Sequence, residues 1–157
     1  MIRLLELLRR LLGRGRSRYL HGAGATPMQV TLKFLGESLD PASISRTLGL
    51  APTGSGRKGD PIAAELPNGR SVSRPSITGY WYLDLPQGTS GDAAVAGMMD
   101  SLSCGETVFR DLAREWQGQL IVHEAGAGVS AGDLFSGQTL AALSAAGLDL
   151  YVNEDGK

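Results

Sequence analysis

The side chains best suited to chemistry in this chain lie in one glycine-rich loop, residues 51–60. Two hydroxyls and two adjacent cations stand there among three glycines: Thr53, Ser55, Arg57 and Lys58. Backbone N–H groups of glycine-rich turns, with cations beside them, can form an anion-binding concavity. A phosphate-binding P-loop is excluded, because that motif ends in Gly-Lys-Ser/Thr and Lys58 is followed by Gly59. Two interpretations stay open: an anion or nucleotide site, or a turn held by Asp60 and Pro61 whose cations are solvated.

An aromatic cluster offers a second chemistry. Alternation over Ile77–Leu85 predicts a strand with Tyr80 and Tyr82 on one face and Trp81 on the other. Core packing accounts for Trp81, and its ring is also a candidate to stack a ligand held by the cationic loop. Exposed Tyr80 and Tyr82 are candidates to bind a partner, because tyrosine joins an apolar ring to a hydrogen-bonding hydroxyl.

Two motifs near the C-terminal end are weaker. The stretch Gly126–Ala131 has the Gly-x-Gly-x-x-Ala order of a dinucleotide fingerprint, but Gly132 and Gly137 interrupt the helix that should follow. Ser130 also lies in a Gly-x-Ser-x-Gly pattern, yet no histidine follows it to complete a hydrolase triad. Neither motif predicts a catalytic residue.

Metal and cofactor chemistry have little support. The chain holds two histidines, His21 and His123, and a single cysteine, Cys104. Cys104 has no nearby Cys or His to share a zinc ion, so we predict no metal site and no cofactor, and expect the thiol to pack in the core. One cysteine also excludes an intramolecular disulfide, which favours the cytoplasm. The sequence leans towards a non-enzymatic protein without deciding the point.

Charge divides the chain in two. Residues 1–27 carry six arginines and one glutamate, a net charge of +5, whereas residues 28–157 carry nine basic and fifteen acidic side chains, a net charge of −6. An acidic body repels phosphate backbones, so we expect it to bind no nucleic acid. Its long-range field favours a basic protein partner instead.

The basic segment has its own pattern. Leucines at helical spacing over residues 1–12, with arginines between them, predict a basic amphipathic helix that a glycine-rich linker follows to residue 27. We therefore predict an arm at 1–27, either accessory or the product of a start placed too far upstream, and a single domain at 28–157. Contact of residues 1–18 with a membrane surface is a further option. No apolar run reaches the roughly 18 residues that a membrane span needs.

The element order predicts the fold class. Asp40 is the expected N-cap of a helix that begins at Pro41. The order favours an α+β domain with a single, mostly antiparallel (mixed) sheet of about five strands and two or three helices on one face. The predicted strands are residues 28–35, 62–66, 77–85, 119–124 and 148–152, and the predicted helices are 41–48, 92–102, 106–117 and 138–146.

Four segments in order carry a family resemblance: Gly36–Thr53, Arg57–Asp60, Trp81–Leu83 and Leu140–Asn153. Over about residues 28–153 the chain resembles DUF4279, a bacterial family of domains of unknown function. It departs from that pattern at Gly56, where family members commonly carry a tryptophan. The resemblance implies an α+β fold and no established activity.

These observations together predict a non-enzymatic protein-interaction domain, an immunity or regulatory partner of another bacterial protein. The alternative is a small-molecule, nucleotide or anion-binding domain that uses the Arg57–Lys58 loop, with enzymatic activity left open.

Overall fold

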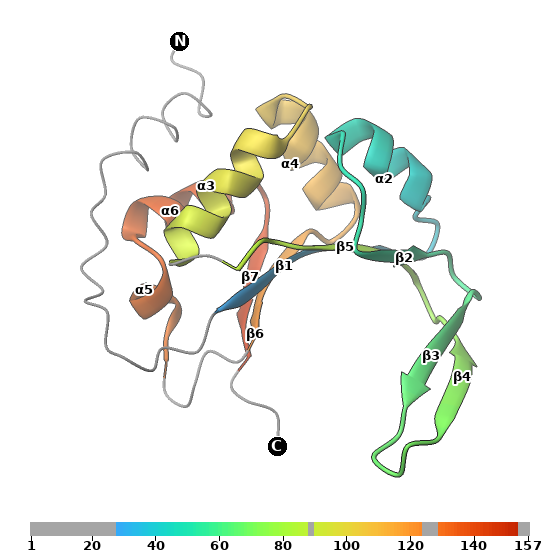
Figure 1. The fold of residues 1–157 in the computed structure, drawn as a ribbon. Coiled ribbons are helices and arrows are strands. Elements are labelled where there is room, and N and C mark those ends of the chain that lie inside the picture. Colours follow the sequence, from blue (N-terminus) through green and yellow to red (C-terminus); the bar gives the residue numbers. More distant parts are fainter. Residues whose placement is uncertain (1–27, 88–89, 124–128, 154–157) are drawn as a thin grey trace.

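The structure is a computed structural model that describes residues 28–87, 90–123 and 129–153 (Figure 1). The arm predicted at 1–27 and the glycines of the dinucleotide-like motif lie outside these residues.

Five strands form one mixed sheet in the order β2-β5-β1-β6-β7. Neighbours run antiparallel except β6 and β7, which are parallel and joined through helices. The mostly antiparallel five-stranded sheet is thus confirmed. Its composition differs at β2, which was predicted to be loop. The strands are β1 (Gln29–Gly36), β2 (Gly54–Gly56), β5 (Gly79–Asp84), β6 (Gln119–His123) and β7 (Asp149–Val152).

The remaining two strands, β3 (Pro61–Glu65) and β4 (Ser71–Pro75), pair only with each other. They form a hairpin that projects from the β2 end of the sheet, away from the helices (Figure 1). The sequence predicted β3 but placed it in the main sheet, and it missed β4. Every residue of β4 is exposed, so no apolar alternation marks this strand.

The helices are α2 (Pro41–Leu48), α3 (Gly91–Ser101), α4 (Glu106–Glu115), α5 (Ala131–Leu134) and α6 (Gly137–Ala145). The longer ones, α2, α3, α4 and α6, lie on one side of the sheet, where two or three were expected (Figure 1). The predicted break between α3 and α4 is confirmed. Within the described ranges, no helix has the length and hydropathy that crossing a bilayer requires.

The core lies between the sheet and these helices, with Trp81 fully buried at its centre. The Trp81 ring packs against Phe34 of β1 at a centroid distance of 5.7 Å, and Phe34 packs in turn against Phe109 of α4 at 6.2 Å. The indole Nε1–H donates a hydrogen bond of 3.0 Å to Ser45 Oγ of α2. Trp81 therefore joins the central strands to two helices.

We predict that Trp81→Ala destabilises the domain by about 3–5 kcal/mol, because it removes a fully buried aromatic ring and leaves a cavity. Denaturant unfolding measures the change. Leu66→Ala, at an exposed position directly after β3, is the control and should change the unfolding free energy by less than about 0.5 kcal/mol. Equal effects of the two substitutions would contradict the central place of Trp81.

Candidate functional site

The side of the sheet that faces away from the helices is here called the open face. Strand alternation brings Tyr80 and Tyr82 of β5 to it, and cross-strand register places Lys33 of β1 beside Tyr82. Neither α2, α3, α4 nor α6 covers this side (Figure 1). The open face therefore presents aromatic and charged side chains from the two strands at the middle of the sheet.

Tyr80 and Tyr82 were expected to be exposed but are half-buried, and they stack on each other with ring centroids 6.4 Å apart and ring planes inclined by 21°. Their rings also lie over the edge strand β2. A Cβ added to Gly54 would stand 2.5 Å from the Tyr82 ring, and one added to Gly56 would stand 2.8 Å from the Tyr80 ring. The glycines of β2 thus leave the space that the tyrosines fill. The Tyr80 ring lies where a larger side chain at position 56 would begin.

A groove of about 400 Å³ runs between the open face and the β3–β4 hairpin. Its sheet wall includes Leu35, Tyr80 and Tyr82, and its other wall includes Ile62 of the hairpin and Ile77 of the segment between β4 and β5. Ile77 is 86% exposed, unusual for so large an apolar side chain. The same groove also contains Lys33 and Arg74. Apolar surface and positive charge are therefore combined in one concave site.

The angle of the hairpin is set by a tight turn at its base, Arg57–Asp60, here called the anchor turn. The Asp60 carboxylate accepts a hydrogen bond of 2.7 Å from the Arg57 N–H, and the Asp60 N–H donates to the Arg57 carbonyl at 3.1 Å. Gly59 adopts φ = +91°, a conformation that glycine tolerates best. Gly59 and Asp60 each form a 2.8 Å backbone bond with Ser76, which joins the turn to the far end of the hairpin.

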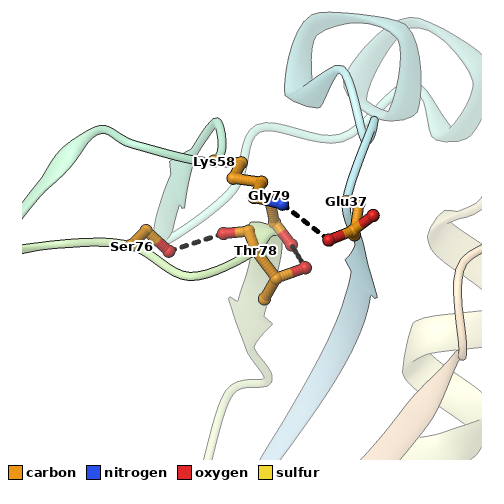
Figure 2. A network of polar contacts seen from close by, with 5 residues as sticks. All are labelled: Glu37, Lys58, Ser76, Thr78 and Gly79. Carbon is orange, nitrogen blue, oxygen red and sulfur yellow. Dashed lines mark hydrogen bonds and ion pairs between the residues drawn. The ribbon is translucent and has the colours of Figure 1, made fainter.

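The two cations of the anchor turn are both paired. Arg57 Nη2 lies 2.8 Å from Asp40 Oδ1. Lys58 Nζ lies 2.6 Å from Glu37 Oε1, as Figure 2 shows. The hydrogen bond from Arg57 lowers the pKa of Asp40, and the hydrogen bond from Lys58 lowers the pKa of Glu37. These pairs tie the turn to the segment that joins β1 to α2. Asp40 is the N-cap residue of α2, as predicted, but its side chain bonds Arg57 and makes no capping hydrogen bond.

Next to the Lys58–Glu37 ion pair, Figure 2 shows two hydroxyl groups that donate hydrogen bonds to the backbone leading into β5. Ser76 Oγ donates to the Thr78 carbonyl, and Thr78 Oγ1 donates to the Gly79 carbonyl at 3.3 Å. The path from the hairpin into β5 is therefore held by local hydrogen bonds.

The remaining loop residues predicted to bind an anion do not converge on one concavity. Thr53 Oγ1 accepts a 2.9 Å bond from the Asp84 N–H, so this hydroxyl fastens the entry to β2 onto β5. Ser55 is exposed on β2, and Trp81 is buried beneath the sheet. A buried ring has no surface on which a ligand in the loop can stack. The structure instead brings Tyr80 and Tyr82 together with the groove.

Sequence reasoning missed Lys33 and Arg74. Lys33 occupies a polar position of β1, and Arg74 lies in a strand without apolar alternation. Only the pairing of β1 with β5 and the fold of the hairpin bring them to the tyrosines. No local sequence signal marks this arrangement.

A polar chain also crosses the open face on three neighbouring strands. The Oγ1–H group of buried Thr31 donates to Asp84 Oδ1 at 2.6 Å. His123 Nε2 lies 3.1 Å from the same Thr31 Oγ1. A hydroxyl has one proton to donate, so the His123 Nε2–H is the donor to Thr31. The hydroxyl proton thus points to Asp84 and not to the histidine, which is the reverse of a histidine-activated nucleophile.

The other reactive groups have structural surroundings. Ser130 Oγ bonds Asp133 Oδ2 at 2.7 Å in the capping box that begins α5. Cys104 is half-buried against the core, and burial raises the pKa of its thiol. Among the described residues, no group of three or more His, Cys, Asp and Glu side chains is placed to hold a metal ion.

A family model described as a domain of unknown function (DUF4279) matches residues 26–155. The chain belongs to the DUF4279 family. The match confirms the resemblance seen in the sequence, and it spans every described element of the fold. No curated protein and no solved structure matches the chain. The chemistry of this DUF4279 domain must therefore be argued from its own side chains.

We predict that Glu37→Gln/Asp40→Asn lowers the stability of the DUF4279 domain at neutral pH, because the anchor turn loses both ion pairs. The folded-state pKa values of Glu37 and Asp40 are lowered. The extra unfolding free energy of the wild type is therefore fully present above the unfolded-state pKa values, about 3.9 for Asp and 4.3 for Glu. It disappears as the pH falls through the lower folded-state values. Urea unfolding from neutral to strongly acidic pH measures the difference in unfolding free energy between the wild type and the double variant.

The control for this series is Asp149→Asn, an exposed carboxylate without an ion-pair partner in the described part of the chain. Its unfolding free energy should differ from that of the wild type by much less at neutral pH. A stability difference between wild type and the double variant that persists unchanged in acid would contradict the ion-pair account.

We predict that inorganic phosphate does not raise the melting temperature of the wild-type DUF4279 domain, because both cations of the loop are already bonded to carboxylates. Glu37→Gln/Asp40→Asn frees the cations, so phosphate should stabilise this variant more than the wild type. Chloride at matched ionic strength is the control. A phosphate-dependent rise in the wild type that Arg57→Ala/Lys58→Ala abolishes would restore the loop as an anion site.

Proposed function

We propose that this domain is a non-enzymatic protein-interaction domain that binds a partner through its open face, centred on Tyr80 and Tyr82. The main support for this proposal is the stacked tyrosine pair. The pair lies beside a largely apolar groove, on a side of the sheet that the longer helices leave free. Protein interfaces are enriched in tyrosine, which supplies a large contact area and a hydroxyl at little entropic cost.

The surroundings of the reactive groups support a binding role over catalysis. The hydroxyls of Thr31, Thr53 and Ser130 each take part in bonds that hold the fold together. The cations of the glycine-rich loop likewise hold the anchor turn. This arrangement favours the interaction domain over the alternative of an anion-binding domain that uses Arg57 and Lys58.

We assign the interaction to the immunity or regulatory class, in which a small domain acts by occupying the surface of another protein. The cytoplasm is the proposed compartment, because a chain with one cysteine needs no oxidising environment to fold.

The test is site-specific photo-crosslinking of the full chain in cells of the source organism. A benzoylphenylalanine at position 82 should trap one discrete protein, whereas the same probe at exposed Ala42 on α2 should not. With the trapped protein purified, Tyr80→Ala/Tyr82→Ala should weaken binding at least about tenfold, as expected for aromatic hot spots.

Tyr151→Ala is the matched control, since this exposed tyrosine lies on β7, at the far edge of the sheet from β2. It should leave the affinity unchanged. Circular dichroism melts check that all variants fold. Two results would rule out the open face as the binding surface. One is the same crosslinked protein from positions 82 and 42, and the other is an equal loss of affinity in Tyr80→Ala/Tyr82→Ala and in Tyr151→Ala.

A further inference from the structure

The groove beside the tyrosines has a charge opposite to that of the domain around it. Residues 28–157 carry a net charge of −6, yet the charged side chains that line the groove are Lys33 and Arg74, with no acidic residue among them. Neither cation forms an ion pair within the described part of the chain, in contrast to Arg57 and Lys58. Local positive charge without an internal partner calls for an anionic group on the ligand.

The rest of the lining calls for apolar contact. Leu35 and the two tyrosine rings line the sheet side, and Ile62 of the hairpin and the strongly exposed Ile77, which follows the hairpin, line the other side. Apolar surface left in water favours burial by about 25 cal/mol for each Å² removed from solvent. A ligand that fits both features carries apolar side chains next to carboxylates.

The shape of the groove favours a polypeptide segment over a small molecule. Small-molecule sites enclose their ligands and bury roughly 70–90% of the ligand surface. This groove is lined by residues of the sheet, of the hairpin and of the segment between β4 and β5, and it is only partly enclosed. A segment of another protein can place a few side chains between the walls while its backbone stays outside.

The charge of the N-terminal segment of this chain does not complement the groove. Residues 1–27 carry a net charge of +5, and Lys33 and Arg74 would repel them. A segment of opposite charge from another molecule suits the groove better.

We propose that the groove binds an acidic, apolar segment of the partner protein, with carboxylates paired to Lys33 and Arg74 and an apolar or aromatic side chain against Tyr80 and Tyr82. This inference rests on the proposed interaction function and adds to it the chemistry of the segment that is recognised. Arg74 suits the role because its planar guanidinium binds a carboxylate through two parallel hydrogen bonds. The overall acidic field governs approach over longer distances, whereas the groove decides which segment is held.

The experiment is selection of random linear 12-residue peptides on the full chain. Enriched peptides should combine Asp or Glu with aromatic or branched aliphatic residues. One enriched peptide, made with a fluorescent label, should lose at least about tenfold in affinity when its acids are replaced by their amides, and its binding should weaken with salt.

Variants of the domain locate the effect. Lys33→Glu/Arg74→Glu should weaken the same peptide at least about tenfold and favour a version with lysine in place of its acids. Arg70→Glu is the matched control, because it reverses a charge on the same hairpin outside the groove lining, and it should leave affinity unchanged. Lys33→Gln/Arg74→Gln repeats the test without introduced repulsion, and thermal melts confirm that each variant folds.

Each remaining outcome overturns the inference. These outcomes are no enrichment, enrichment of neutral or basic peptides, and indifference to the Lys33 and Arg74 variants. A wild-type dimer in sedimentation that Lys33→Glu/Arg74→Glu dissociates would assign the groove to a second copy of the chain. If the crosslinked partner depends on Tyr80 and Tyr82 but not on Lys33 and Arg74, this inference fails while the proposed function stands. If position 82 traps no protein, the proposed function fails as well.

Discussion

The anchor turn, Arg57–Asp60, is the constraint on which the candidate site depends. A two-stranded hairpin is marginal in isolation, so its direction must come from contacts at its base. The turn supplies these contacts through backbone bonds to Ser76 and through ion pairs to Asp40 and Glu37. Three distant parts of the chain meet there: the end of β1, the entry to the hairpin and the entry to β5. The groove exists because the hairpin is held at this angle to the sheet.

A single strand, β5, supplies both the stability of the domain and its candidate binding surface. Alternate residues point to opposite faces, so Trp81 enters the core while Tyr80 and Tyr82 stay on the open face. The glycines of β2 complete the arrangement, because side chains at positions 54 and 56 would force the tyrosine rings to move from the places they occupy. The glycine-rich segment that first suggests a phosphate loop thus packs beneath two aromatic rings and leads into the anchor turn.

Apolar periodicity explains which parts of the fold were predictable. Strands β1, β5, β6 and β7 and the longer helices carry clear patterns, and the sequence located them within a few residues. Strand β2 has only Gly-Ser-Gly, and β4 is exposed throughout, so neither carries such a pattern. The roles of Arg57 and Lys58 also escaped prediction, because their carboxylate partners lie 17 and 21 residues away in the sequence. Lys33 and Arg74 become neighbours of the tyrosines only through tertiary structure.

The most direct test of this account is the distance distribution between spin labels at Ala63 on β3 and Ala42 on α2, measured by double electron–electron resonance. Cys104 is replaced by serine so that only the two introduced cysteines carry labels. If the anchor turn sets the angle of the hairpin, the distribution is narrow. It then broadens when Asp60→Ala is combined with Glu37→Gln/Asp40→Asn. A distribution that is equally broad with and without these substitutions would contradict the account, because the groove would then have no fixed shape.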